Sequence, residues 1–465
     1  MLTRRATRAR DLREAALSLP LLGPLLGDLV KLILRLLPLD ERLRARELSR
    51  GWRFFLEGAS FWTRVDLGVG CGVNPRFLSD SRLALALLRA ACVRAKGGLQ
   101  SVDNSGVAVA WPVARQEVPS VLQWAEALSV ADKANLRDLV APTSRSLYAG
   151  QVTALCRALP LCRVRCGVRC DAVEALPLLR REPPHALLTI GGLRVSNNED
   201  GDQAFLDLAS ALSVCMGMEK LHFFDVPLTT RAVLDALVDA AISAGIKDMD
   251  FEECGLTPTA LPALTRLLQS PGFEELTVYG DSDSLFVGPA APAFCEALRN
   301  CKSLKTLPLS RIDLWYDMAV ATQLFAALEG LPALQTLGLH ENEGLHDASH
   351  KQAAGECLAR LIACSSSLRD LDFTNNFIGL AGQAPIFEVL RGSHSLAVLS
   401  ISQELTFEFA RNVVLPAARA NTSLRWLDGW NPQDDDPHLD ELLLPAMEEV
   451  MDILEARRRA DEEAA

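Results

Sequence analysis

Hydrophobic residues recur in the second half of the chain with one fixed spacing: apolar, two variable, apolar, one variable, apolar. Successive copies start 27 to 34 residues apart, and chance does not maintain such a period over nine copies. The copies begin at Ile190, Met218, Ile246, Phe273, Leu304, Leu334, Leu368, Leu396 and Leu424, the last one being shortened. Each copy predicts a short strand, because alternating apolar residues fall on one face of an extended chain.

The residues between these strands predict helices. Leu261, Leu264 and Leu268 have the i, i+3, i+7 spacing that places apolar side chains on one side of a helix. The same kind of pairing occurs at Leu234 and Leu237, Leu324 and Leu328, and Leu358 and Ile362. One strand and one helix cannot bury their apolar faces alone, so we expect the units to stack.

This unit resembles the leucine-rich repeat, in which each strand is followed by a helix. An Asn or Cys position follows each repeat strand, where a buried side chain satisfies backbone groups of the turn. Asn198, Cys254, Asn342 and Asn376 occupy it. Weaker copies begin near Leu99, Leu136 and Leu161, whereas residues 107–131 show no clear register. The sequence therefore predicts an α/β leucine-rich-repeat solenoid, a horseshoe of about 9–12 repeats over residues 68–430.

Residues 21–67 form a separate leucine-rich segment. Leu29, Leu32, Ile33 and Leu36 share one helical face, and Pro38 ends that helix. Further apolar stripes contain Leu43, Leu48, Trp52, Phe55 and Leu56. A unit of about 45 residues cannot conceal this much leucine, so we expect part of its surface to pair with another polypeptide.

The same segment resembles the F-box, a three-helix domain. The matching positions are Leu37, Pro38, Leu43, Ala45, Arg46, Trp52, Phe61, Trp62, Val65, Asp66 and Leu67. The resemblance implies binding to the Skp-type adaptor of a cullin ubiquitin ligase, through Leu29, Leu32, Ile33, Leu36, Leu37, Pro38, Leu43 and Trp52. With the repeats, the chain resembles F-box/leucine-rich-repeat proteins that carry ribonuclease-inhibitor-like repeats, and residues 62–67 also fit as the first repeat strand.

The residues between the repeating apolar positions of each strand point to the concave face of such a solenoid. We expect a protein target, carrying Lys or Arg and an apolar anchor, to contact His222, Phe224, Asp248, Asp250, Glu252, Glu275, Tyr279 and Trp426. Further concave triplets are Thr336, Gly338 and His340, then Asp370, Asp372 and Thr374. The alternative is that the acids form a solvated face and that Trp426 and Trp430 close the last repeat.

Charge is distributed unevenly along the chain. The net charge is −12, and residues 1–60 carry twelve Arg or Lys against seven Asp or Glu, which leaves −12 − 5 = −17 for the remainder. This acidity argues against a nucleic-acid partner. Residues 1–20 form a basic extension for which an organellar presequence remains an alternative, and Pro20, Pro24 and Asp28 interrupt any membrane span. We expect a chain in the cytoplasm or nucleus that does not enter membranes.

The clusters that resemble metal sites have simpler explanations. Cys156, Cys162, Cys166 and Cys170 lack paired C-x-x-C spacing, so we expect structural thiols rather than zinc ligands. His340, His346 and His350 follow a repeat strand, where a polar surface loop is expected. No phosphate-binding glycine loop or nucleophile elbow is present in the sequence. We therefore expect no catalytic residue, metal or cofactor, and no enzyme activity.

Residues 431–465 begin with an acidic turn-rich break and continue as a helix whose apolar stripe would cap the solenoid. That stripe contains Leu442, Leu443, Met447, Val450, Met451 and Leu454. The sequence thus favours a non-catalytic substrate-recognition subunit of a ubiquitin ligase. Two alternatives remain: a leucine-rich-repeat scaffold or inhibitor in which residues 21–67 serve only as a cap, and an enzyme with a metal near residues 156–170.

Overall fold

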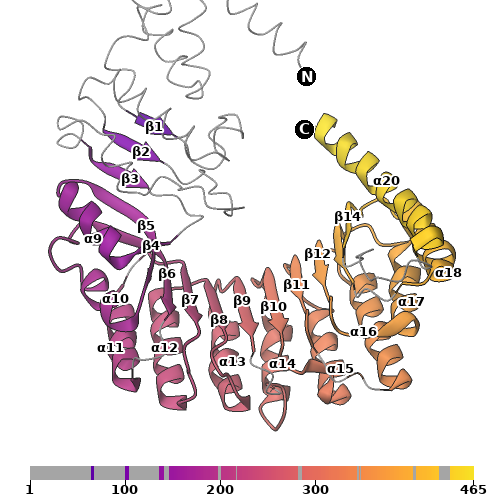
Figure 1. Ribbon diagram of the computed structural model, residues 1–465. Helices are drawn as coiled ribbons and strands as arrows, with labels where there is room; N and C mark the ends of the chain where they lie inside the picture. Colours follow the sequence, from indigo (N-terminus) through magenta and orange to yellow (C-terminus); the bar gives the residue numbers. More distant parts are fainter. Residues whose placement is uncertain are drawn as a thin grey trace, which may run out of the picture. The chain divides into compact units, whose positions relative to one another are not determined.

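The computed structural model divides the chain into two compact units, which meet in sequence between Arg194 and Val195 (Figure 1). The described residues are 64–66, 100–103, 136–140, 146–196, 201–215, 217–280, 285–342, 345, 347–401, 405–428 and 440–464. The F-box-like segment up to residue 63, with all its expected adaptor contacts, lies outside the described residues, as do Leu67, Asn198, His346 and Trp430.

The first unit contains parallel strands that pair in chain order. They are β1 (Arg64–Asp66), β2 (Ser101–Asp103), β3 (Asp138–Val140) and β5 (Arg163–Cys170), with β4 (Leu147–Tyr148) paired to the far end of β5. Helices α9 (Ala149–Ala158) and α10 (Ala172–Leu179) separate the later strands, and β6 (Leu188–Ser196) crosses the boundary between the units. The segment expected to be the first repeat strand therefore does pair as one, since Val65 lies opposite Val102.

The second unit repeats one strand and one helix. Its strands are β7 (Lys220–Phe224), β8 (Asp248–Glu252), β9 (Glu275–Tyr279), β10 (Thr306–Ser310), β11 (Thr336–Gly338), β12 (Asp370–Asp372), β13 (Val398–Ser400) and β14 (Trp426–Asp428). Its helices are α11 (Asp202–Leu212), α12 (Arg231–Ala244), α13 (Leu261–Gln269), α14 (Ala291–Asn300), α15 (Met318–Leu328), α16 (Ala348–Cys364), α17 (Gly379–Leu390), α18 (Phe407–Phe409), α19 (Leu415–Ala420) and α20 (Asp440–Ala464).

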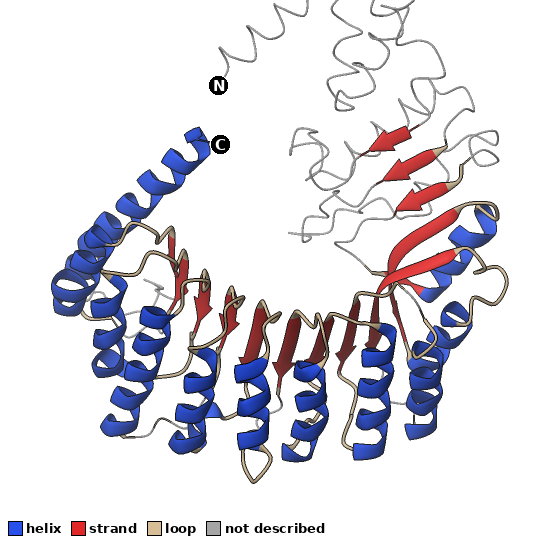
Figure 2. Ribbon diagram, turned by 180° about the vertical axis from the view of Figure 1, so that it is seen from behind, coloured by secondary structure: helices blue, strands red, loops and turns tan. Residues whose placement is uncertain are grey.

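Within this second unit, neighbouring strands are parallel and the helices cover one face of the sheet (Figure 2). The strands line the inner, concave side of the unit and leave that face free of helices. Equivalent residues of successive repeats pair directly, as Leu307 does with Leu337 and Leu337 with Leu371. The predicted leucine-rich-repeat solenoid is confirmed for the described residues.

The core lies between the sheet and the helices. The repeating strand positions Leu304, Leu307 and Leu309 are fully buried, and so are Leu264 and Leu267 of α13. Burying one such leucine side chain contributes about 1.5–3 kcal/mol. The stack therefore draws its stability from the residues whose spacing predicted it.

Buried asparagines connect the turns that follow the strands. Asn342 donates through Nδ2 to the carbonyl oxygens of Leu309 and Leu339, both at 2.7 Å, and its Oδ1 accepts from the Ile312 backbone at 3.0 Å. Asn376 repeats this arrangement one strand later. Cys254 occupies the same position after β8, and its thiol donates to the carbonyl oxygen of Phe223. The expected role of the Asn or Cys position is confirmed at these three residues.

The residue before each of these positions adopts a left-handed backbone. The φ angles of Asp225, Glu253, Arg311, Glu341 and Asn375 lie between 52° and 59°. This conformation turns the chain away from the strand and toward the helix. The turn itself was expected at the Asn or Cys position, but its left-handed residue was not, because the residue type there differs from repeat to repeat.

Helix α20 covers the last repeat of the second unit. Met447, Val450 and Leu454 are buried, and the helix packs against α19 and β14. The Arg457 guanidinium donates to the backbone carbonyls of Leu424 and Ala418. None of the helices in the described ranges combines the length and apolar character needed to cross a membrane.

Candidate functional site

Three neighbouring strands bring most of the predicted target-binding residues together. The pairing of β7, β8 and β9 aligns their outward side chains in three rows: Lys220, Asp248 and Glu275; His222, Asp250 and Thr277; and Phe224, Glu252 and Tyr279. Their apolar neighbours on the same strands point toward the helices and are buried. We call this set of nine residues the acidic strand surface.

The first row shares one ammonium group between two carboxylates. Lys220 Nζ lies 2.8 Å from Asp248 Oδ2, and Glu275 lies opposite Asp248 on the next strand. Burial raises the pKa of Asp248, an effect that Lys220 only partly offsets. Burial and the charge of Asp248 raise the pKa of Glu275. Burial is the main cause of both shifts, so these two carboxyls bind a proton more readily in the folded chain than they would in water.

In the next rows, His222 holds two carboxylates rather than presenting its ring to solvent. Its side chain is only 8% exposed, and Nε2 lies 3.4 Å from Asp250 Oδ2 and 3.1 Å from Glu252 Oε2. The ring also meets Phe224 edge-on, with 6.3 Å between ring centroids. His222 therefore fixes the positions of the neighbouring acids, and of these Glu252 is more exposed than Asp250.

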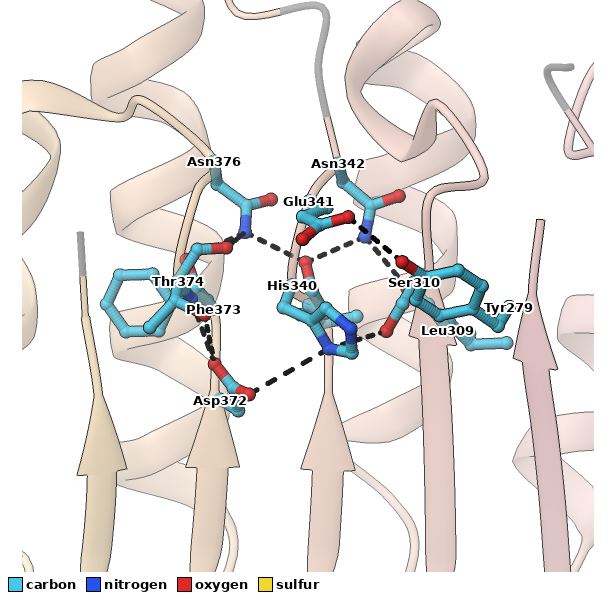
Figure 3. A network of polar contacts seen from close by, with 11 residues as sticks. Tyr279, Leu309, Ser310, His340, Glu341, Asn342, Asp372, Phe373, Thr374 and Asn376 are labelled. Atoms are coloured by element: carbon cyan, nitrogen blue, oxygen red, sulfur yellow. Dashed lines mark hydrogen bonds and ion pairs between the residues drawn. The ribbon is translucent and has the colours of Figure 1, made fainter. Parts of the chain in front are cut away.

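Tyr279 forms the edge of this surface toward the following repeats (Figure 3). Its hydroxyl donates to Glu341 Oε2 at 3.1 Å, and the Arg311 guanidinium lies 5.3 Å from the centre of its ring. Arg311 also lies 3.7 Å from Glu341, so the tyrosine is held between a cation and a carboxylate. The ring keeps a defined orientation, which suits an aromatic contact residue.

Ser310, His340 and Asp372 lie on three successive repeats but do not form a catalytic triad. Ser310 Oγ and Asp372 Oδ2 approach the same ring nitrogen, His340 Nδ1, at 2.8 and 3.8 Å (Figure 3). A triad histidine uses one nitrogen for the nucleophile and the other for the acid. Since Ser310 is also buried, this arrangement supplies no accessible nucleophile.

Trp426 lies apart from the other predicted contact residues. It is on β14, five strands beyond β9, and is 39% exposed. The Arg458 guanidinium of α20 lies 4.8 Å from the centre of its ring. This position agrees with the alternative interpretation, in which the tryptophan helps to close the last repeat.

The four clustered cysteines of the first unit are core residues. Cys156, Cys162, Cys166 and Cys170 are all buried. Burial raises the pKa of the Cys156 thiol to about 11 and that of Cys166 to about 12, so both stay protonated at neutral pH. Within the described ranges no group of His, Cys, Asp and Glu has an arrangement suited to a metal ion.

Two of the three histidines expected in a polar surface loop are described by the structure. His350 is in the first turn of α16, with Nδ1 3.1 Å from Asp347, and His340 forms a hydrogen bond with Ser310. Arg311 and Glu341 were not predicted as part of the site. Both occupy the left-handed turn position, where the alternation rule for strands gives no direction for a side chain.

Comparisons with known proteins give a limited result. No family model matches the chain, and no curated protein is similar to it. Among solved structures, yeast Rad7 from its complex with Elc1 is 14% identical over 66% of this chain and 73% of its own, with a TM-score of 0.40. The leucine-rich-repeat protein LegL7 from Legionella pneumophila is 14% identical over 60% of this chain and 94% of its own, with a TM-score of 0.36.

Proposed function

We propose that this chain is a non-catalytic receptor that binds a target protein on the acidic strand surface. The observation that carries the proposal is the register of β7, β8 and β9, which assembles four carboxylates and two aromatic rings on the face that the helices leave open. Aromatic residues beside charged groups are common in the energetically dominant parts of protein interfaces.

The electrostatics of this surface favour a basic target. The row contains two carboxylates, those of Asp248 and Glu275, and a single cation, Lys220. A lysine or arginine side chain from a target would supply a second cation to this row. Phe224 and Tyr279, in the row at the other end of the strands, would contact the apolar part of the same segment.

We further propose that the receptor serves a ubiquitin ligase. This half of the proposal is supported by the F-box resemblance of residues 21–67, with Leu37, Pro38 and Trp52 as its clearest positions. The adaptor would hold residues 21–67, the repeats would hold the target, and the lysines of the target would come within reach of the ubiquitin carrier. Catalysis by proximity needs no reactive group on this chain.

A capture experiment tests the adaptor end of the bridge. The full chain and a variant lacking residues 1–67 would be mixed with a purified Skp-type adaptor, and bound adaptor would be measured. We expect the full chain to retain the adaptor, and Leu37→Asp or Trp52→Ala to abolish retention. Failure of the intact chain to bind leaves the second candidate, a repeat scaffold or inhibitor whose residues 21–67 are only a cap.

The target end is tested with a double variant, Asp250→Asn with Glu252→Gln, which removes two negative charges from the acidic strand surface. Targets captured by the intact chain should be lost from this variant, and their binding should weaken as salt rises. Asp202→Asn is the matched control, because Asp202 is an exposed acid at the start of α11, on the helical side of the repeat. Equal capture by the double variant and the control would contradict the assignment of the surface.

A further inference from the structure

Two aromatic side chains are exposed on loops that lead from a strand to a helix in the second unit. Tyr316, between β10 and α15, is 73% exposed, and Phe377, between β12 and α17, is 51% exposed. Because the strands are parallel, both loops leave the sheet at the same edge. Large apolar side chains exposed together in this way often mark a surface that binds another protein.

Phe377 adopts a backbone conformation that is unfavourable for its residue type. Its φ angle is +54°, and the equivalent position after β8 is Gly255, with φ of +60°. A glycine takes this left-handed conformation without steric cost, whereas a bulky residue is strained in it. An exposed phenylalanine gains little burial in return, so the folded chain alone gives no reason for this residue here.

A buried hydrogen bond between Trp315 and Asn376 links the two loops. The residue before Tyr316 is Trp315, which is buried and donates from Nε1 to Asn376 Oδ1 at 2.6 Å. Trp315 also stacks on Phe325 of α15, with 5.5 Å between ring centroids. Asn376 precedes Phe377 and is itself held by the carbonyls of Leu339 and Phe373. The exposed rings therefore stand on a rigid base, which reduces the entropy that binding would cost.

The loop that carries Tyr316 and the loop of the repeat between the two rings are acidic. Their described parts carry Asp313, Asp317 and Asp347, whereas Arg311 and Glu341 pair with each other beside Tyr279, and the loop after β12 has no charged residue. Asp317 and Asp347 accept hydrogen bonds from the first turns of α15 and α16, and both carboxylates remain solvent-accessible. The surroundings favour a partner with positive charge.

We infer that Tyr316 and Phe377 form a second docking surface, separate from the acidic strand surface, for a basic segment of a partner protein. The two loops belong to repeats two strands apart, and the hydrogen bond from Trp315 to Asn376 holds them close to each other. The segment would place an apolar side chain against each ring, and its Lys or Arg residues would face the loop carboxylates. We call this surface the aromatic loop edge.

Differential selection from a phage library of random 16-residue peptides tests the inference. The full chain is panned in parallel with its double variant Tyr316→Ser, Phe377→Gly. We expect the intact chain to enrich peptides that combine net positive charge with two or more apolar residues. Synthetic copies should bind the double variant at least tenfold more weakly. Identical enrichment on both proteins, or enrichment of neutral or acidic peptides, would overturn the proposal.

Two further variants separate this surface from the proposed target site and from misfolding. Asp250→Asn, on the acidic strand surface, should leave the affinity of the selected peptides unchanged, and Asp313→Asn should lower it several-fold at low salt. The thermal midpoint of the double variant should match that of the intact chain, because glycine suits the backbone at position 377. Selected peptides that lose affinity with Asp250→Asn but keep it with the double variant would refute the aromatic loop edge.

Discussion

At the scale of single residues, a few buried polar groups determine how the repeats join. The Asn342 side chain forms hydrogen bonds with backbone groups of four residues, Leu309, Ile312, Leu314 and Leu339, and each of those groups is buried where water cannot replace the amide. An unsatisfied buried donor or acceptor costs about 1–3 kcal/mol. The asparagine is therefore worth more to stability than its size suggests.

Replacing Asn342 with alanine should lower the free energy of unfolding by about 3 kcal/mol, because at least two backbone groups lose their partner. Urea unfolding followed by circular dichroism would measure the loss. Asn300→Ala is the control, since Asn300 is exposed and bonds only within α14. A loss no greater than that of the control would contradict the role of the buried amide.

At Phe377, glycine and alanine should differ in a direction that reveals the backbone strain. Both substitutions remove the exposed ring, but only glycine accepts φ of +54° freely. We expect the free energy of unfolding of Phe377→Gly to be about 1 kcal/mol higher than that of Phe377→Ala. The comparison uses the same urea titration, and an alanine variant as stable as the glycine variant would show that the position is unstrained.

At the scale of elements, the repeat spacing predicted where strands and helices lie but not their lengths or the turns between them. The strand positions and helix faces follow from leucine periodicity, which reports burial directly. The same pattern occurs in β8, with five residues, and in β12, with three. Strand length depends instead on backbone partners in the neighbouring repeats, which no single repeat specifies.

The candidate site was predictable to the same extent. The alternation of strand side chains correctly placed the acids of β8 beside Glu275 and Tyr279 on β9. It did not reveal that His222 is mostly buried between two carboxylates. It also did not reveal that Tyr279 reaches Glu341, because that contact skips a repeat and depends on the side-chain lengths of both residues.

The row of Lys220, Asp248 and Glu275 should make stability depend on pH. The pKa of Glu275 is raised, so the folded chain binds its proton more tightly than the unfolded chain does. The carboxyl therefore supports folding most at low pH, and this contribution is lost as pH rises through the raised pKa. Glu275→Gln should stabilise the chain at pH 7 by on the order of 1 kcal/mol, and the gain should vanish near pH 4.

Urea titrations between pH 4 and pH 7 would measure this dependence. Glu274→Gln is the matched control of opposite sign, because the hydrogen bond from Lys305 lowers the pKa of that exposed neighbour. The control variant Glu274→Gln should not raise the free energy of unfolding at pH 7. A gain for Glu275→Gln that is the same at every pH would show that charge repulsion is not its cause.

At the scale of the whole molecule, the repeats of the second unit contact mainly their neighbours, so each end needs protection from water. Helix α20 provides it at the C-terminal end through Met447, Val450 and Leu454. Hydrogen bonds from Arg457 to the last turn of the preceding repeat add to the apolar contact. Loss of this cap should therefore destabilise β13 and β14 before the other strands.

Val450→Asp places a charge in the fully buried contact between α20 and the last repeat. Amide hydrogen exchange should then accelerate in β13 and β14 while the protection of β8 and β9 is retained. Glu448→Gln, on the exposed side of the same helix, should leave all exchange rates unchanged. Uniform acceleration across every strand would instead show that the unit opens as one body.

The bond from Trp315 to Asn376 passes over the repeat that contains β11 and ties β10 to β12. In a stack held only by adjacent contacts, mechanical force would peel the repeats away one at a time. A tie that bridges three of them makes their rupture simultaneous. When the second unit is stretched between its ends, these three central repeats should therefore unfold together in a single large step.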